Sequence, residues 1–164
     1  MDVYILRHGK AKDTGPGMGD ADRRLTKKGR EEIAAAGRWM VTQELRFDLI
    51  VASPLVRAQE TATIIAGYLG EKDCIVTWKV LAPGGNTDTV CRQIGELTDV
   101  RTILLVGHEP LLSALISHII AGNENTAISM PKGALAKIRN FSYTLSPSGE
   151  LRWLVTAAQM ADKQ

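Results

Sequence analysis

Two histidines, each close behind a short apolar run, are the residues of this chain best suited to do chemistry. Arg7 and His8 follow residues 3–6, and His108 follows residues 103–107. A neutral imidazole nitrogen can attack phosphorus as a nucleophile. The guanidinium of Arg7 can hold two oxygens of an oxyanion at once. These residue types predict phosphoryl transfer at a site that both histidines share.

Apolar runs alternate along the chain with segments of helical spacing, and this alternation predicts how the histidines meet. We expect strands at residues 3–6, 49–52, 75–81, 102–106, 134–138 and 151–155, with a turn at 146–149 between the last two. We expect helices at residues 27–45, 53–69, 87–97 and 111–120, with Thr26 and Ser53 as N-caps of the first two and Pro54 in the first turn of the second. Such an order is typical of an α/β three-layer sandwich, a largely parallel central sheet with helices on both faces. Ligands bind these sheets outside the carboxyl ends of the strands, where both histidines stand.

Length and composition indicate one ordinary globular domain over residues 1–164. The chain has 45% apolar and 23% charged residues, with no linker, internal repeat or low-complexity segment. Its formal charge is only +2, its basic residues are scattered, and it has three Trp, three Tyr and two Phe, so we expect no nucleic-acid partner. The longest apolar stretch, residues 111–121, contains Ser113, Ser117 and His118 and is too short to span a bilayer, so we expect no membrane partner.

The two cysteines, Cys74 and Cys91, argue against a disulfide-stabilised or zinc-binding protein. With no export signal, the two thiols are expected to stay reduced, which predicts a cytoplasmic location. They lack Cys-x-x-Cys spacing and no His-Glu-x-x-His motif is present, so no zinc site is expected. The absence of a Gly-x-x-x-x-Gly-Lys phosphate loop disfavours an ATPase or kinase. His118 has no partner pattern, and we expect it to be structural or exposed.

Three segments, in this order, resemble the signature segments of the histidine phosphatase superfamily, also called the phosphoglycerate mutase-like family. They are Arg7-His8-Gly9, the run Ser53-Pro54-Leu55-Val56-Arg57-Ala58-Gln59-Glu60-Thr61-Ala62, and Val106-Gly107-His108-Glu109-Pro110. Each stands at the end of an expected strand, and together they span most of the chain. The short length leaves no room for the helical insertion subdomain of larger members. With the Gly-His-Glu-Pro form, it makes the chain most similar to the SixA-type branch, the phosphohistidine phosphatases.

The resemblance implies a role for each residue of the expected site. His8 would be the nucleophile that becomes phosphorylated, with Arg7, Arg57 and His108 around the phosphoryl group. Two guanidiniums and an imidazole suit a loose transition state whose charge lies on the equatorial oxygens. The helix that starts near Ser53 would add the positive end of its dipole. Ser53 caps this helix, contacts phosphate, or does both, and the cap is the favoured interpretation. These residues imply no metal and no cofactor.

One departure from the wider family concerns the proton that an ester leaving group needs. Many members that act on phosphate esters carry a glutamate acid in the loop after the third strand, and the corresponding residues 81–86 include no acid. A phosphohistidine ring can leave as a neutral imidazole, whose reference pKa is about 6.5, and therefore tolerates this loss. Asp13, Asp88 and Glu109 are the candidates for a carboxyl acid elsewhere, and Glu109 could equally be a first-turn helix charge.

We therefore expect a metal-independent phosphatase that acts on phosphohistidine in proteins through a phosphorylated His8. The enzymatic alternative is a phosphomonoesterase on a small phosphorylated metabolite, whereas a mutase would need the acid and the insertion that are missing. A non-catalytic phosphate-recognition module is a further alternative, which the intact His8 disfavours. The glycine-rich residues 15–19, flanked by basic residues, are either a mobile loop on the substrate side or a plain flexible surface loop.

Overall fold

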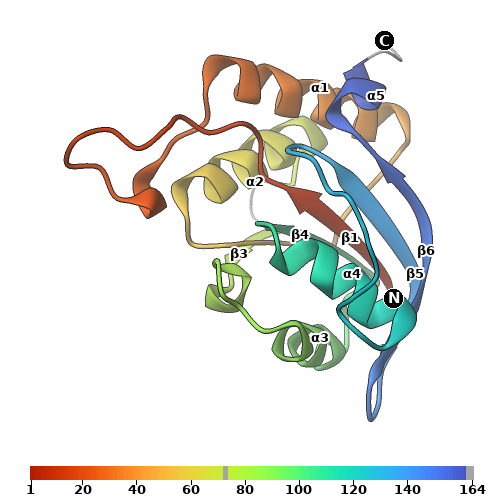
Figure 1. The fold of residues 1–164 in the computed structure, drawn as a ribbon. Coiled ribbons are helices and arrows are strands. Elements are labelled where there is room, and N and C mark those ends of the chain that lie inside the picture. The colour runs from red at the N-terminus through yellow and green to blue at the C-terminus, as the bar shows by residue number, and fades with distance from the viewer. Residues whose placement is uncertain (72–73, 162–164) are drawn as a thin grey trace.

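The computed structural model describes residues 1–71 and 74–161, and it places helices on both faces of one central sheet (Figure 1). The strands are β1 (Asp2–Arg7), β2 (Leu49–Ala52), β3 (Ile75–Thr77), β4 (Thr102–Gly107), β5 (Leu135–Tyr143) and β6 (Pro147–Val155). The α-helices are α1 (Lys27–Thr42), α2 (Val56–Leu69), α3 (Thr87–Gly95), α4 (Leu111–Ala121) and α5 (Ala157–Ala161). Residues 72–73 and 162–164 of the expected 1–164 domain lie outside the described residues.

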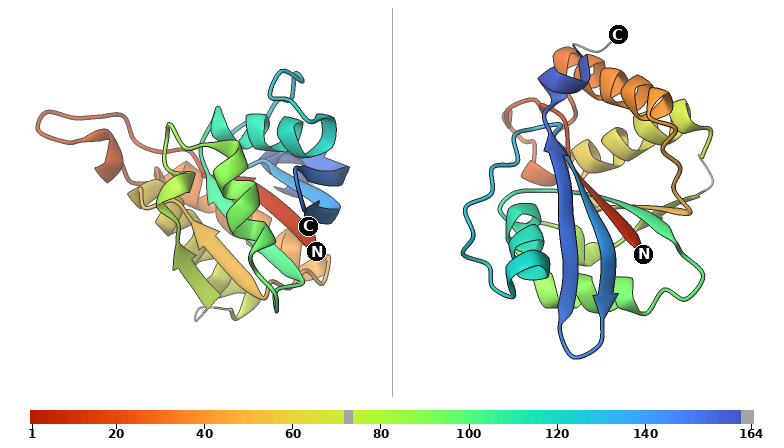
Figure 2. Two further views of the ribbon diagram at one scale, coloured as in Figure 1. Left: turned by 90° about the horizontal axis from the view of Figure 1, so that it is seen from below. Right: turned by 90° about the vertical axis from the view of Figure 1, so that its right-hand side faces the viewer.

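The six strands lie side by side in the order β3-β2-β4-β1-β5-β6. The four strands from β3 to β1 run parallel, and β5 and β6 add an antiparallel hairpin beside β1. Helices α1, α2 and α5 cover one face, and α3 and α4 cover the other (Figure 2). This arrangement confirms the expected α/β sandwich with a largely parallel sheet. The described part of the chain contains no helical insertion subdomain.

Alternate residues of the central strands point to opposite faces, which explains why these runs are apolar throughout. In β1, Val3 and Ile5 belong to the core under α3 and α4, whereas Tyr4 and Leu6 belong to the core under α1 and α2. A parallel strand that is covered on both faces needs an apolar residue at every position. Each such side chain contributes about 1.5–3 kcal/mol when it is fully buried. Packing in the two cores therefore fixes the positions of the strand ends, and His8 and His108 directly follow two of these ends.

The edge of the sheet and the ends of the helices differ from the sequence prediction. The third strand ends at Thr77 and continues as a 3-10 turn, η3 (Lys79–Leu81). Strands β5 and β6 are longer than the predicted 134–138 and 151–155, so the turn between them lies at 144–146 rather than 146–149. This hairpin is half exposed and contains an irregular register near Asn140, which hides the alternation that marks a strand. Helix α1 ends three residues early, although Thr26 caps its start as predicted, since Oγ1 of Thr26 accepts a hydrogen bond from the N–H of Gly29 at 2.9 Å.

Two further expectations concern the membrane and the thiols. Across residues 1–71 and 74–161, every helix is too short or too polar to cross a membrane. Cys74 and Cys91 are both free thiols, as expected, and Cys91 lies on the buried face of α3, in the core.

Candidate active site

Three neighbouring parallel strands end at the same edge of the sheet and deliver the polar residues of the site. Strands β1 and β4 end in register, and β2 ends beside β4 one residue earlier. His8, His108 and Ser53 follow these ends. The ring centroids of His8 and His108 lie 4.9 Å apart, and Nε2 of His108 lies 2.7 Å from Oγ of Ser53. The strand order therefore brings the two predicted histidines into one site.

His8 is almost fully buried, and each of its ring nitrogens has its own partner. Nδ1 lies 2.7 Å from the carbonyl oxygen of Gly9, so Nδ1 carries the proton and donates it to this oxygen. Nε2 accepts a hydrogen bond from Nε of Arg57 at 3.2 Å and therefore holds the lone pair. Burial, followed by the proximity of His108, Arg57 and Arg7, lowers the pKa of His8 to about 3 against the opposing effect of the Gly9 bond. His8 is thus a neutral imidazole, the protonation state that a nucleophile needs.

Gly9 and Thr61 fix the position of His8 relative to helix α2. A Cβ atom at Gly9 would lie 2.7 Å from Cγ1 of Ile33, so only glycine lets the chain pass this close to α1. The N–H of Gly9 donates to Oγ1 of Thr61 at 3.2 Å, and the Thr61 hydroxyl donates to the carbonyl oxygen of Arg57 at 2.7 Å. Thr61 therefore ties the strand end that carries His8 to the helix that carries Arg57. The sequence motif contained Thr61 but gave no sign of this contact.

Arg57 enters the site from the first turn of α2, with its side chain only 4% exposed. Besides the bond from Nε to His8, Nη1 donates to the carbonyl oxygen of Asp20 at 2.7 Å and Nη2 donates to Oδ2 of Asp20 at 3.0 Å. Asp20 begins the 3-10 turn η1 (Asp20–Asp22) in the segment between β1 and α1, which protrudes from the body of the protein (Figure 1). Asp20 is a site residue that sequence reasoning missed. Its partner is 37 residues away, and no motif spacing connects the two.

Two buried nitrogens of the predicted site, Nε of Arg7 and Nδ1 of His108, have no hydrogen-bond partner among the described residues. Nη1 of Arg7 is held by the carbonyl oxygen of Met130 at 2.8 Å. Burial, followed by the charge of Arg57, lowers the pKa of His108 to about 4. A buried polar atom without a partner costs about 1–3 kcal/mol. These two nitrogens therefore remain available as hydrogen-bond donors beside the guanidiniums of Arg7 and Arg57, an arrangement that suits a bound anion.

Ser53 does not cap α2, and the prediction that this helix starts at residue 53 is wrong. Helix α2 begins at Val56, and its N-cap residue Leu55 makes no side-chain capping bond. Ser53 is fully buried, where its Oγ bonds His108 and also accepts from the N–H of Leu55 at 3.4 Å. Pro54 accordingly precedes the helix instead of standing in its first turn. The Ser53 hydroxyl bonds to the buried imidazole of His108, and this bond takes the place of the helix cap that serine commonly forms.

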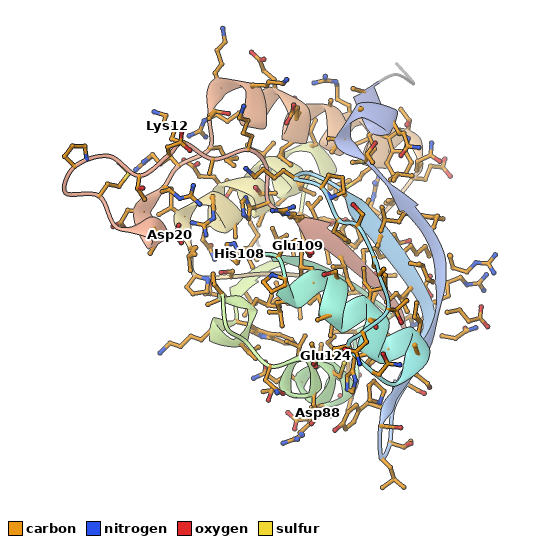
Figure 3. All side chains as sticks on the ribbon, in the orientation of Figure 1. Lys12, Asp20, Asp88, His108, Glu109 and Glu124 are labelled. Atoms are coloured by element: carbon orange, nitrogen blue, oxygen red, sulfur yellow. The ribbon has the colours of Figure 1, made fainter. Side chains whose placement is uncertain are left out.

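None of the three carboxylates named as acid candidates bonds to either histidine. Asp88 pairs with an arginine of α3 at 2.7 Å and accepts from the hydroxyl of Tyr143 at 3.1 Å. Figure 3 shows Asp88 on the α3 side of the molecule, well away from His108 and Asp20. Glu109 accepts from the N–H of Ser113 at 3.0 Å, which is the first-turn role considered for it. Asp13 is exposed and makes no hydrogen bond or ion pair within the described ranges.

A second unforeseen carboxylate, Glu124, lies beside residues 81–86, the segment that corresponds to the acid-bearing loop of ester-cleaving family members. Residues 84–87, the start of α4 and Glu124 line a hollow of about 190 Å³. The carboxylate of Glu124 accepts a hydrogen bond from the Thr87 hydroxyl. Glu124 belongs to a loop without regular structure, so no periodic pattern marked it. His118, by contrast, lies outside the site, as expected, with its Nε2 3.9 Å from Oδ1 of Asp88.

Comparisons with known proteins give the chain relatives that match it over nearly all of its length. Residues 3–82 match the family model of the histidine phosphatase superfamily (branch 1). An uncharacterised protein of Picosynechococcus sp. is 30% identical over 143 residues, which cover 85% of this chain and 86% of that protein. Phosphohistidine phosphatase SixA of Escherichia coli is 24% identical over 162 residues, which cover 98% and 96%. A solved structure of the protein histidine phosphatase SixA complexed with tungstate aligns with a TM-score of 0.84 and 25% identity, covering 96% and 98%.

Proposed function

The chain belongs to the histidine phosphatase superfamily, in its SixA-type branch, and on this basis we propose that it dephosphorylates phosphohistidine in proteins through a phosphorylated His8. The observation that carries the proposal is the state of His8. Its ring is buried and neutral, with Nδ1–H bonded to Gly9 and the Nε2 lone pair facing Arg57. This one arrangement serves both halves of a covalent reaction.

In the first half, the Nε2 lone pair of His8 attacks phosphorus, and the P–N bond to the substrate imidazole breaks. The Nε–H of Arg57 moves from the lone pair to a phosphoryl oxygen as the new bond forms. Arg7 supplies the N–H of its unpaired Nε to a second oxygen. The Ser53 hydroxyl donates to Nε2 of His108, which leaves Nδ1–H of His108 for the phosphoryl group. Hydrogen-bond donors fixed in this way stabilise the charge of the transition state without reorganising.

In the second half, water attacks the phosphorus of phospho-His8 and the P–Nε2 bond breaks. The proton on Nδ1 stays on His8 throughout, because the carbonyl oxygen of Gly9 holds it at 2.7 Å. His8 therefore leaves as a neutral imidazole, while one proton of the attacking water stays on the new hydroxyl of the phosphate product and the other passes to the solvent. Arg7 and Arg57 supply the positive charge that a metal ion gives in other phosphatases, so the proposed mechanism is metal-independent.

Protein-bound phosphohistidine fits this site because its ring needs little help to leave. When the second ring nitrogen is protonated, the substrate imidazole departs neutral, whereas an alkoxide must be protonated as it leaves. None of the predicted acids bonds to His8 or His108, and the carboxyl group that does contact the site, Asp20, is held ionised by Arg57. No helical subdomain in the described ranges covers the sheet edge, which leaves room for a substrate carried on another protein.

One observation favours the alternative, a phosphomonoesterase that acts on a small metabolite. Glu124 lines a hollow together with residues 84–86, which belong to the segment 81–86 in which ester-cleaving relatives are expected to carry their acid. A protonated Glu124 could serve an ester leaving group from that hollow. The relative turnover of phosphohistidine and of alkyl phosphates therefore separates the two functions.

The test uses a protein phosphorylated on histidine, alkyl phosphate esters, and three forms of this protein. Wild type and His118→Ala, which removes a histidine outside the site, are expected to dephosphorylate the phosphoprotein and to yield an acid-labile phosphoenzyme on rapid quench. His8→Ala is expected to lose about three orders of magnitude in turnover and to yield no adduct. Near-normal turnover by folded His8→Ala would contradict the covalent route, and faster cleavage of alkyl phosphates would contradict the substrate.

A further inference from the structure

The end of the Arg57 guanidinium is held by a residue outside the sequence motifs. A guanidinium has five N–H groups. Asp20 takes one on Nη1 and one on Nη2 through its own carbonyl oxygen and carboxylate, at 2.7 and 3.0 Å. Nε, on the side edge of the same group, is thereby directed to Nε2 of His8 at 3.2 Å. The contact with Asp20 thus decides which edge of Arg57 faces the nucleophile.

Asp20 is itself fixed from the opposite side. Nε of Arg23 donates to Oδ1 of Asp20 at 3.0 Å, and Nη1 of Arg23 donates to the carbonyl oxygen of Lys12 at 3.1 Å. These bonds lie across the base of the protruding segment, whereas Gly15 and Gly17 near its tip have no neighbours around their Cβ positions. Figure 3 places Asp20 and Lys12 on this segment, on the same side of the molecule as His108. The segment therefore presents a held carboxylate to the site.

We propose that Asp20 is a positioning residue, which holds the end of the Arg57 guanidinium so that its side edge meets the phosphoryl group on His8. The inference rests on the proposed function of His8 and extends it to the segment between β1 and α1. An arginine side chain has many rotamers, and ordering it costs conformational entropy. The two hydrogen bonds to Asp20 at the far end of the guanidinium order the side chain before the substrate arrives. Preorganisation of this kind increases the rate of reaction.

Two other roles for Asp20 fit the geometry less well. A general acid must hold a proton near neutral pH, but the hydrogen bond from Arg57 lowers the pKa of Asp20 and keeps it a carboxylate. An inhibitory counter-ion would have to occupy the edge of Arg57 that faces His8. Asp20 instead occupies the end, and the side edge already points at Nε2 of His8.

The experiment measures single-turnover formation of phospho-His8 from a histidine-phosphorylated protein, over a range of substrate concentrations. The variants are Asp20→Ala, Asp20→Asn, Arg57→Ala and the double variant Asp20→Ala/Arg57→Ala. Asp22→Asn is the matched control, because Asp22 belongs to the same turn and its side chain makes no ion pair in the described structure. Thermal unfolding of every variant reports whether the fold is retained.

Asp20→Ala is expected to lower the rate constant for phospho-His8 formation about tenfold, the rate equivalent of one hydrogen bond to a charged group. Asp20→Asn, whose amide oxygen still accepts from Nη2, is expected to recover part of this loss, and Asp22→Asn to stay within about twofold. In the Arg57→Ala background, Asp20→Ala is expected to have no further effect, because the two residues then act as one unit.

Three results would overturn the positioning role: an Asp20→Ala enzyme as fast as Asp22→Asn, an equal loss in Asp20→Ala and Asp20→Asn, or an undiminished effect of Asp20→Ala without Arg57. The second would assign the effect to charge alone, and the third to a direct action of Asp20. Failure of the proposed function looks different, since wild type itself would then form no phospho-His8.

Discussion

Acidification from pH 6 to pH 5 is expected to destabilise the folded protein through its two buried site histidines. Burial, the largest cause for each, lowers the pKa of His8 to about 3 and that of His108 to about 4. In the unfolded chain both rings titrate near about 6.5. Between these values the unfolded chain binds protons that the folded chain does not. The stability present above pH 6.5 is therefore lost as the pH falls through this window.

The size of the loss follows from proton linkage. For one histidine that stays neutral when folded, lowering the pH from 6 to 5 reduces the free energy of unfolding by about 1.2 kcal/mol. His8 and His108 together give about 2.4 kcal/mol, a large fraction of the stability of a small domain. Asp20, Asp48 and Asp88 have lowered pKa values, so their contribution to the stability of the fold is lost as the pH falls below the unfolded value of about 3.9. Burial raises the pKa of Glu71, but this carboxyl group is the same in every variant, so comparison of wild type with the histidine variants isolates the contribution of the histidines.

Urea unfolding at pH 6 and pH 5 measures this difference for wild type, His8→Gln, His108→Gln and the double variant. Each glutamine is expected to remove about half of the wild-type difference, and the double variant most of it, whatever its absolute stability. Comparing each protein with itself at two pH values cancels the cost of the substitution. Equal pH differences in wild type and in the double variant would refute the conclusion that the site histidines are neutral when folded.

Three further predictions concern the chemistry. Arg57→Lys keeps the charge but loses the planar fork that Asp20 and His8 share, so phospho-His8 formation should fall at least about tenfold in a quench assay; wild-type rates would show that transfer needs only the charge of Arg57. EDTA should leave turnover unchanged, because Arg7 and Arg57 supply the positive charge, whereas inactivation reversed by a divalent ion would contradict this. Across aryl and alkyl phosphates, single-turnover rates should depend steeply on the pKa of the leaving group. A shallow dependence that Glu124→Gln makes steep would identify Glu124 as an acid and favour the small-metabolite phosphatase, with Glu109→Gln as its control.

The pair of histidines could be predicted from sequence because two strong signals coincide there. Continuous apolar runs mark strands that are buried on both faces, and parallel strands end at one edge. Any polar residue directly after such runs must reach that edge, whatever the details of packing. His8 and His108 needed no further information. Arg57 needed more, since an arginine in the first turn of a helix is ordinarily a solvated charge, and only the surrounding motif indicated its role.

Ser53 and Asp20 show where local patterns stop. A serine before a proline and a helical run predicts an N-cap, but His108, 55 residues further along, takes the same hydroxyl. Capping bonds contribute about 1 kcal/mol, and a buried imidazole nitrogen left unpaired costs at least as much. Asp20 lies in a protruding segment whose path is set by hydrogen bonds at its base, and the apolar residues around it in the sequence show no helical or strand periodicity. Both residues are assigned by contacts between distant segments, which a single sequence does not reveal.

In the proposed mechanism, the hydrogen bond between His8 and Gly9 removes the need for a positioned acid. A proton fixed on Nδ1 leaves the lone pair on Nε2 for attack, and the same proton keeps the ring neutral when phosphorus departs. Nucleophile and leaving group are then equivalent imidazoles, so transfer from a phosphohistidine substrate needs little net driving force in either direction. The main remaining requirement of this proposed mechanism is alignment of the phosphoryl oxygens with the guanidiniums. A carboxylate at such a site contributes more by holding Arg57 than by donating a proton, and Asp20 has the geometry for the former.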